Sequence, residues 1–505
     1  MSRTALNPKI PSLGELDRSA GSLGRQLAQK LREAIKGGAL KAGDALPSTR
    51  ALASSLGVAR GTVVEAFEQL IAEGFLESSP GLGTYIAHAL SSSEARSTKH
   101  RSVALATQPS PSSAEPFNAV AAQFEPLPPV PFAVSIPLGA ASPGPVWRRL
   151  GNRLRAHGLG APGGYGDPQG ALPLREAIAE YVRRSRSVRC EAEQVIVTTG
   201  TQQGLFLACL VLMGREDFAW VENPAYPGIT AILNTVGAPD RMVRVPVDEE
   251  GLDVEAGIRE QADARVAFVT PSHQYPLGMP MSMARRNALL AWARAQSAWI
   301  VEDDYDSEFR YSGHPFPSLQ GLDPERVIYL GTFSKVLFPS LRLAYAIVPP
   351  QLVKAFCGAR ILLDRHPPSA DQHVLASFIS EGHLERHIRR MRGIYTQCRN
   401  HLFEIVSAVL PGELARLQPC DQGMHSVLWL AAHIDDVAVA QGALKEGVAV
   451  RPVSTMYKAG DGRPGLILGL SAFSPEQMTK AAKKLARIIT ELAQVHKAKK
   501  KSDAA

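Results

Sequence analysis

Hydrophobic positions near the N-terminus of the chain recur at helical spacing. Three segments carry apolar residues three or four positions apart, which is the period of a helix with one buried face. The predicted helices cover residues 23–35, 49–56 and 60–73. Ser48 is the expected N-cap of the second helix, and a tight turn at Gly57 separates it from the third. Two strand-like segments follow, joined by a glycine-rich tip that ends at Gly83.

The larger C-terminal part has a different pattern. Short apolar runs alternate with helical segments, at residues 195–197, 218–221, 266–269, 299–301 and 327–330. Continuous apolar strands separated by helices predict an α/β fold, with a mostly parallel sheet covered on both faces. Residues 350–495 suggest long helices with a few strands, which is typical of a smaller lobe.

Residues 91–132 separate the two patterns. This stretch is rich in serine and proline and shows neither helical nor strand periodicity, so we expect an extended, semi-rigid linker. The sequence therefore predicts a small domain over residues 20–88, the linker, and a large domain over residues 133–495. A chain of 505 residues is long enough for this organisation.

The composition limits the expected cellular location and the expected partners of the protein. The five cysteines are scattered and show no zinc-ligand spacing, which predicts reduced thiols, no metal site and a cytoplasmic location. No long apolar run predicts a membrane span. The net charge of +7 is compatible with a polyanionic partner, although many soluble proteins share it.

The small domain has the pattern of a winged helix-turn-helix. Its third helix would place Arg60 and Thr62 at the end that enters the major groove of DNA, and Arg50 lies on the preceding helix. Residues 21–88 contain seven basic and six acidic residues, so DNA binding requires the charges to be arranged by face. The alternative is a small helical dimerisation domain with solvated arginines.

Chemistry-bearing residues follow two of the predicted strands of the large domain. Lys335 comes after the run at 327–330, and Asp303 and Tyr305 come after the run at 299–301. A lysine that forms a Schiff base, a carboxylate that keeps a pyridine nitrogen protonated and a tyrosine that holds the ring oxygen are what pyridoxal 5′-phosphate requires. Asp304 competes for the carboxylate role, but Asp303 shares a strand face with Tyr305.

A phosphate group would need its own site. Gly200 and the residues after it open a helix behind the strand at 195–197, and helix starts favour anions. Thr332, Ser334 and Arg342 could converge on the same anion. The alternative for Gly200 is a structural turn. Tyr226 could stack on a cofactor ring, although simple packing is the alternative for a tyrosine between Ala225 and Pro227.

These motifs resemble known families. Residues 46–50, 56–63 and 70–75 resemble the GntR winged-helix family, which implies DNA contacts at Arg50, Arg60 and Thr62, with Gly83 in the wing. Residues 301–311, 329–335 and 339–342 resemble fold type I aminotransferases, and specifically the MocR/GabR regulators, which fuse both domains. The resemblance implies cofactor contacts from Lys335, Asp303, Tyr305, Thr201, Gln202, Ser334, Arg342 and Tyr226. It also implies head-to-tail dimers in which Tyr165 reaches the phosphate of the partner subunit.

One position departs from the enzymes. Ile467 stands where aminotransferases often carry an arginine that binds the substrate carboxylate, and residues 272–278 resemble the regulators more than the enzymes. We therefore expect a regulator that binds an operator in double-stranded DNA and senses pyridoxal phosphate or an amine without a carboxylate, unless Arg451 replaces the missing arginine. The alternatives are an active aminotransferase with an accessory DNA-binding domain, and a structural DNA-binding dimer with a vestigial cofactor.

Overall fold

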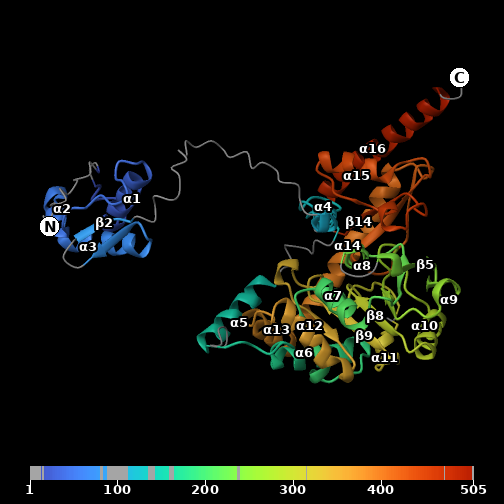
Figure 1. The fold of residues 1–505 in the computed structure, drawn as a ribbon. Helices are drawn as coiled ribbons and strands as arrows, with labels where there is room; N and C mark the ends of the chain where they lie inside the picture. The colour runs from blue at the N-terminus through green and yellow to red at the C-terminus, as the bar shows by residue number, and fades with distance from the viewer. Residues whose placement is uncertain are drawn as a thin grey trace. The chain divides into compact units, whose positions relative to one another are not determined.

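The chain divides into two compact units, residues 1–110 and 111–505, and each is described by itself (Figure 1). The computed structural model describes residues 13, 16–79, 83–87, 112–134, 143–158, 164–235, 239–313, 316–470 and 473–502, the last eight of these by their backbone alone. None of the helices in these ranges combines the length and apolarity of a membrane span.

The first unit contains three helices and a two-stranded hairpin, as the hydrophobic pattern predicts. The elements are α1 (Leu23–Lys36), α2 (Thr49–Leu56), α3 (Arg60–Ala72), β1 (Leu76–Ser79) and β2 (Gly83–Ile86). Ser48 accepts a hydrogen bond from the backbone of Ala51, which confirms the predicted N-cap. Gly57 ends α2 with a φ of +62°, and this left-handed conformation allows the tight turn into α3. The tip of the hairpin lies outside the described residues.

The small core of this unit joins all three helices to the hairpin. Leu31 of α1, Leu52 of α2 and Phe67 of α3 are buried in one cluster with Leu76 and Ile86 of the strands. The inward spacing of these residues follows the helical period, so burial of one apolar face explains each helix. The unit therefore has the elements and order of a winged helix-turn-helix.

The second unit is built on an eight-stranded sheet of order β3-β10-β9-β8-β7-β4-β5-β6. The parallel strands are β4 (Ala219–Asn223), β5 (Met242–Asp248), β7 (Val266–Val269), β8 (Trp299–Asp304) and β9 (Val327–Thr332). The antiparallel strands are β3 (Val195–Thr198), which pairs with β10 (Ala344–Ile347), and β6 (Gly251–Leu252). The predicted mostly parallel sheet is confirmed.

Helices cover both faces of this sheet. One face packs against α7 (Thr201–Leu212), α8 (Pro227–Thr235) and α12 (Pro350–Leu363), and the other against α9 (Val254–Gln261) and α10 (Met283–Ala295). Adjacent strand residues alternate between the two cores: Ile300 belongs to one and Val301 to the other. Burial on both faces explains why the strands read as continuous apolar runs.

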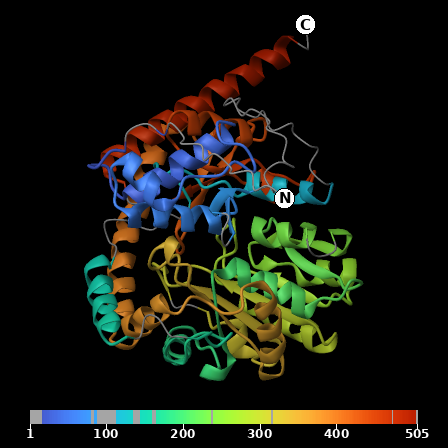
Figure 2. The ribbon, with the colours of Figure 1, turned by 60° about the vertical axis from the view of Figure 1, so that its left-hand side comes forward.

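The C-terminal elements form a smaller lobe (Figure 2), and the other remaining helices pack beside the large sheet or connect it to this lobe. An antiparallel sheet has the order β11 (Ala415–Leu417), β12 (His425–Leu430), β14 (Gly465–Gly469) and β13 (Arg451–Pro452). The other helices are α5 (Gly144–Ala156), α6 (Leu172–Arg186), α11 (Leu319–Leu322), α13 (Ala370–Ser380), α14 (His383–Val409), α15 (Asp436–Lys445) and α16 (Pro475–Ser502). The predicted smaller C-terminal lobe is confirmed.

One segment differs from the expectation of an extended linker. Residues 115–123 form the helix α4 (Glu115–Gln123), preceded by a short 3₁₀ turn at Ser112–Ala114. Pro116 sits in the first turn, where a helix tolerates proline, and α4 lies against α8. Nine residues carry too little periodicity to predict a helix, and this one depends on its tertiary contact. Residues 91–111 lie outside the described part of the chain.

Candidate functional site

A cavity of about 510 Å³ opens where the carboxyl ends of several strands of the large sheet face the C-terminal lobe. Ligands in open α/β sheets commonly bind at this edge. The walls come from the loops after β3, β4, β7, β8 and β9, from β12 and β13, and from α4. The lining residues are Gln123, Phe124, Val134, Thr201, Tyr226, Pro227, Thr270, Tyr275, Asp303, Tyr305, Asp306, Lys335, Met424, His425, Arg451, Pro452, Thr455 and Met456.

Lys335 follows β9 and lines this cavity. Burial lowers the pKa of the Lys335 amine to about 8, and the carboxylates of Asp306 and Asp303 oppose part of that shift. A lysine with a lowered pKa is partly neutral near physiological pH, and the neutral amine is the nucleophile. The site therefore contains an amine suited to attack a carbonyl group.

The two neighbouring carboxylates at the end of β8 have different surroundings. Asp303 lines the cavity, and its Oδ1 atom has no hydrogen-bond partner among the described residues. Burial, with the negative charge of Asp304 beside it, raises the pKa of Asp303 to about 7. Asp304 instead forms a 2.7 Å ion pair with Arg186 and accepts a 2.6 Å hydrogen bond from Tyr329. Asp303 is thus the carboxylate available to a cationic group of a ligand.

The start of α7 forms a concave surface around Gly200. The φ of Gly200 is +140°, and a Cβ added there would lie 2.6 Å from the guanidinium of Arg342. Glycine therefore lets Arg342 approach the helix start closely. Thr201 lines the cavity, and the hydroxyl of Ser334 is buried with no partner among the described residues. A helix start, an arginine and a spare hydroxyl together suit a phosphate.

Two residues predicted near the phosphate make other contacts and do not line the cavity. The hydroxyl of Thr332 accepts a 3.1 Å hydrogen bond from the backbone N–H of Ser334. The amide of Gln202 donates to the carbonyl of Gly228 at 3.0 Å and accepts a 3.3 Å hydrogen bond from Tyr226. Thr332 therefore supports the turn before Lys335, and Gln202 holds the ring of Tyr226 at the cavity wall.

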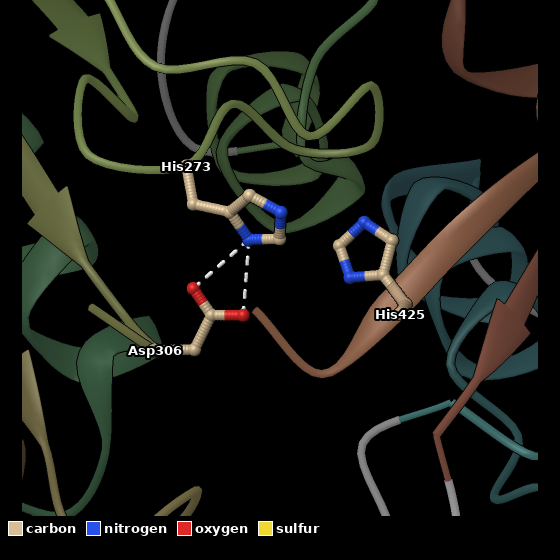
Figure 3. Close-up of side chains that lie close together, drawn as sticks. All are labelled: His273, Asp306 and His425. Atoms are coloured by element: carbon tan, nitrogen blue, oxygen red, sulfur yellow. Dashed lines mark hydrogen bonds and ion pairs between the residues drawn. The ribbon is translucent and has the colours of Figure 1, made fainter. Parts of the chain in front are cut away.

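His273, Asp306 and His425 form a buried cluster that the sequence pattern did not predict (Figure 3). The Nδ1 atom of His273 lies 3.0 Å from both carboxylate oxygens of Asp306. His425 donates from Nε2 to the carbonyl of Pro276 at 2.9 Å, and burial lowers its pKa to about 4. By residue type the three could also ligate a metal ion, but hydrogen bonds already engage the Nδ1 atom of His273.

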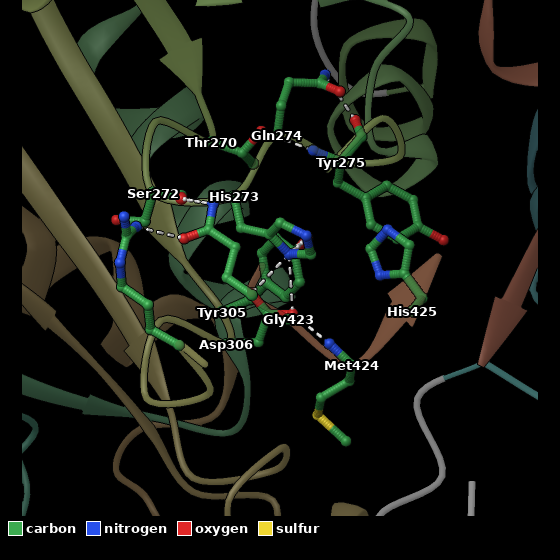
Figure 4. A network of polar contacts seen from close by, with 12 residues as sticks. Thr270, Ser272, His273, Gln274, Tyr275, Tyr305, Asp306, Gly423, Met424 and His425 are labelled. Atoms are coloured by element: carbon green, nitrogen blue, oxygen red, sulfur yellow. Dashed lines mark hydrogen bonds and ion pairs between the residues drawn. The ribbon is translucent and has the colours of Figure 1, made fainter. Parts of the chain in front are cut away.

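The same cluster extends to Tyr305, whose hydroxyl lies 2.9 Å from the Nδ1 atom of His273 (Figure 4). Tyr275, two residues after His273, lines the cavity, and its backbone N–H donates to Thr270 at 3.0 Å. The sequence signal for His273 was the regulator-like segment 272–278, which contains it. Asp306 lies in the regulator-like segment 301–311, but the resemblance gave it no role of its own beside Asp303 and Tyr305.

Arg451 is the arginine that reaches the cavity from the C-terminal lobe. It lies in β13 directly opposite Ile467 of β14. Ile467 is fully buried in an apolar cluster with Leu277, Val427, Val453 and Met456. The absence of an arginine at position 467 therefore does not leave this wall of the cavity without a cation.

Tyr165 lies apart from the cavity in this chain. It is 79% exposed, and the guanidinium of Arg365 lies 4.1 Å from the centre of its ring. The ring of His366 is 6.0 Å away at a steep angle. The residue is accessible, and the contacts described for it are with the loop after α12.

The four residues predicted to contact DNA lie on the surface of the first unit. Arg50 and Arg60 are exposed near the starts of α2 and α3, and Thr62 is half-buried one residue before the core position Val63. The guanidinium of Arg60 lies 3.4 Å from the hydroxyl of Thr49. Gly83, at the start of β2, is exposed with a φ of +93°. Arg60 and Thr62 thus occupy the first turn of the helix that follows the tight turn.

Comparison with known proteins identifies both parts of the chain. Residues 23–86 match the family of bacterial regulatory proteins, gntR family, and residues 130–485 match aminotransferase class I and II. The chain is 39% identical to the probable rhizopine catabolism regulatory protein MocR of Rhizobium meliloti, over 92% of this chain and 93% of that protein. It is 34% identical to the pyridoxine biosynthesis transcriptional regulator PdxR of Corynebacterium glutamicum, over 94% and 95%.

A solved structure supports the fold of the second unit. LysN, an α-aminoadipate aminotransferase from Thermus thermophilus complexed with N-(5′-phosphopyridoxyl)-L-leucine, is similar with a TM-score of 0.66 and 28% identity. The similarity covers 72% of this chain and 92% of LysN. The regulators MocR and PdxR align with this chain over nearly their whole length. The chain therefore belongs to the MocR/GabR family of transcriptional regulators, in which a GntR-type DNA-binding domain precedes an aminotransferase-like domain.

Proposed function

We propose that this DNA-binding regulator holds pyridoxal 5′-phosphate on Lys335 and senses an amine that enters the same cavity. The observation that carries the proposal is the composition of the cavity wall. It combines the amine of Lys335 with Gln123 and Phe124, which lie at the end of α4, a helix in the stretch between the two matched domains. A ligand in this cavity would touch the segment that leads back toward the DNA-binding domain.

The residues present fit the cofactor. Lys335 would form the Schiff base, and the unpartnered Oδ1 atom of Asp303 would receive the pyridine N–H. A pyridinium beside Asp303 would keep this carboxylate ionised despite its burial. Tyr305 would hold the ring oxygen, and Tyr226 would stack on the ring. The cofactor would supply an aldehyde that exchanges between Lys335 and an incoming amine.

The phosphate would lie at the start of α7. Thr201 would contribute from the helix, and Ser334 and Arg342 from the loop after β9. Gln202 would hold the ring of Tyr226 beside the cofactor, and Thr332 would support the loop before Lys335. The spare hydroxyl of Ser334 and the close approach of Arg342 to Gly200 support this assignment. The site would thus neutralise the phosphate through a helix terminus and a guanidinium.

The effector would be an amine or a vitamer of the cofactor. A primary amine is required because it must displace Lys335 from the Schiff base. Arg451 on the opposite wall favours an amine that also carries an anionic group, since an arginine binds carboxylates through two parallel hydrogen bonds. This broadens the expectation from the sequence, in which Ile467 made a carboxylate ligand doubtful.

The DNA-binding surface would be the first turn of α3. Arg60 and Thr62 would reach the base edges or phosphates of the operator, Arg50 would support them from α2, and Gly83 would belong to the wing. The exposure of Arg50, Arg60 and Gly83 and the partial exposure of Thr62 support these roles. The proposed domains are residues 20–88 for DNA binding, 91–132 for the linker, which includes α4, and 133–495 for sensing.

The assembly would be a head-to-tail homodimer in the cytoplasm. In such a dimer Tyr165 would reach the phosphate of the partner subunit, and its exposure in the single chain supports a contact of that kind. A symmetric dimer would also match a two-fold operator, because each subunit would place one α3 helix in a half-site.

A gel-shift titration tests the proposal. The DNA would be the region upstream of the protein's own gene, with pyridoxal phosphate and candidate amines added separately and together. We expect the operator affinity of the wild type to change on addition of the ligands, and that of Lys335→Ala to stay near the apo level. An equal response of both proteins would refute sensing through Lys335. Sustained conversion of an amino acid and a keto acid would instead favour an active aminotransferase.

A further inference from the structure

His273 lies between two side chains that line the cavity, although it does not line the cavity itself. Its Nδ1 atom is 3.0 Å from both oxygens of Asp306 and 2.9 Å from the hydroxyl of Tyr305. His273 and Asp306 are 2% and 1% exposed, so water does not screen the contacts (Figures 3 and 4). The three residues form one short hydrogen-bonded chain that ends at the cavity.

The chemistry of Asp306 fixes the direction of these hydrogen bonds. An ionised carboxylate can only accept, so the Nδ1 atom of His273 must carry the hydrogen and donate it. The backbone N–H of Met424 also donates to Asp306, at 3.2 Å, so two N–H groups converge on this carboxylate. Among the described residues, the Nε2 atom of His273 has no hydrogen-bond partner. No acceptor among them therefore favours the tautomer with the hydrogen on Nε2.

This hydrogen on Nδ1 determines the orientation of the Tyr305 hydroxyl. A nitrogen that carries a hydrogen cannot accept a hydrogen bond. The hydroxyl oxygen of Tyr305 is therefore an acceptor, and it shares the N–H donor of His273 with Asp306. The hydrogen of the Tyr305 hydroxyl must then point away from His273. Since Tyr305 lines the cavity, the open direction for that hydrogen is into the cavity.

The ring of His273 has little freedom to leave this geometry. A Cβ added to Gly423 would lie 1.9 Å from the Cε1 atom of the ring, and one added to Gly278 would lie 3.2 Å from its Nε2 atom. Both glycines have positive φ values, which other residues rarely adopt. The backbone thus lies close to two edges of the imidazole and holds it against Asp306.

We propose that Asp306 and His273 are positioning residues that fix Tyr305 as a hydrogen-bond donor to the phenolic oxygen of the cofactor. This inference rests on the proposed binding of pyridoxal phosphate at Lys335. It assigns the pair to recognition of one atom of the ligand. Without the pair, the Tyr305 hydroxyl could turn its hydrogen toward another acceptor, and the phenolic oxygen would lose an oriented donor.

The test compares binding of pyridoxal phosphate with binding of its 3-deoxy analogue, which lacks the phenolic oxygen. Calorimetry with the full-length apoprotein would give both affinities. We expect the wild type to prefer the natural compound by on the order of tenfold, the size of one hydrogen bond to a charged group. In Tyr305→Phe the ratio of the two affinities should fall to about one, since the donor is gone.

Two substitutions of His273 separate positioning from packing. His273→Leu removes the donor, and the affinity ratio should fall toward that of Tyr305→Phe. His273→Asn keeps an N–H at about the place of Nδ1, because its amide nitrogen is also bonded to Cγ, and should retain most of the ratio. The double variant His273→Leu with Tyr305→Phe should be no less selective than Tyr305→Phe alone, as expected for residues that act through one another.

The outcomes distinguish this inference from the proposed function. An unchanged ratio in His273→Leu, or loss of the ratio in His273→Asn with a native circular dichroism spectrum, would overturn the positioning role. Equal affinity of the wild type for both compounds would overturn it as well, while binding of the cofactor would still stand. Failure of the wild type to bind either compound would overturn the proposed function itself.

Discussion

Arg451 lies directly opposite Ile467 in the antiparallel pairing of β13 with β14, and it lines the cavity. Directly opposite residues of two antiparallel strands point to the same face of the sheet. An arginine is therefore present on this wall even though the position suggested by the enzymes holds isoleucine. Arg451 supplies this cation from the strand that pairs with β14.

Replacement of Arg451 by leucine should weaken the response to amines that carry a carboxylate. Loss of a charged hydrogen bond costs about 1.5–3 kcal/mol, or roughly a 10- to 150-fold weaker apparent affinity. The measurement is a gel-shift titration with an amino acid and with the matching amine that lacks the carboxylate. The response to the second compound should change little. An equal loss of response to both compounds would show that Arg451 does not bind the carboxylate.

Capture of pyridoxal phosphate by the apoprotein should accelerate as the pH rises, with a midpoint near pH 8. Attack requires the neutral amine, and burial lowers the pKa of Lys335 to about 8. Stopped-flow absorbance in the visible region measures the rate. In Asp303→Asn the midpoint should move lower, because one carboxylate that favours the charged amine is removed. A midpoint near the ordinary lysine value of 10.5 would contradict the burial of this amine.

The stability of the apoprotein should contain a contribution from Asp303 that is lost as the pH rises. The pKa of Asp303 is raised from 3.8 to about 7, so the folded state binds a proton that the unfolded state has released over this range. Thermal unfolding between pH 5 and pH 8 should therefore show Asp303→Asn gaining stability relative to the wild type as the pH increases. Asp240→Asn, at an exposed position, should show no such trend. Parallel curves for Asp303→Asn and the wild type would refute the prediction.

Replacement of Arg60 by alanine should weaken binding to the operator while the cofactor colour is unchanged. One lost base or phosphate contact costs about 1–3 kcal/mol. Arg25→Ala is the control, since Arg25 is exposed on α1 and outside the proposed recognition helix. Gel shifts measure both variants. A similar affinity for Arg60→Ala and Arg25→Ala would remove the start of α3 from the recognition role.

Replacement of Phe124 by alanine should reduce the effector response more than replacement of Phe117. Both belong to the α4 segment, but Phe124 lines the cavity whereas Phe117 is 56% exposed and does not. Partial loss of the apolar contact should weaken effector binding roughly two- to tenfold, since burial of a whole phenylalanine is worth about 1.5–3 kcal/mol. Calorimetry on the cofactor-loaded proteins measures this. Equal effects of both variants would argue against a role of the cavity wall.

The sequence alone determined the architecture and the elements that carry the chemistry. Strands buried on both faces must be continuously apolar, so the runs before Asp303 and Lys335 could be identified from the sequence. Alternation along β8 also separated Asp303 from Asp304, and the structure gives Asp304 its own partner in Arg186. In the first unit, the helical period and the glycine turn at Gly57 identified the elements, because the period of the apolar face and the left-handed turn are local properties of the chain.

The tertiary structure decided what depends on contacts between distant segments. Arg451 reaches the cavity through pairing with β14, α4 lies against α8, and His273 meets Asp306 from 33 residues away in the chain. Sequence periodicity reports which face of an element is buried, and it contains no information on which side chains from other elements share that space. Cross-strand register and close packing determine these contacts between distant residues, and both arise only when the whole domain has folded.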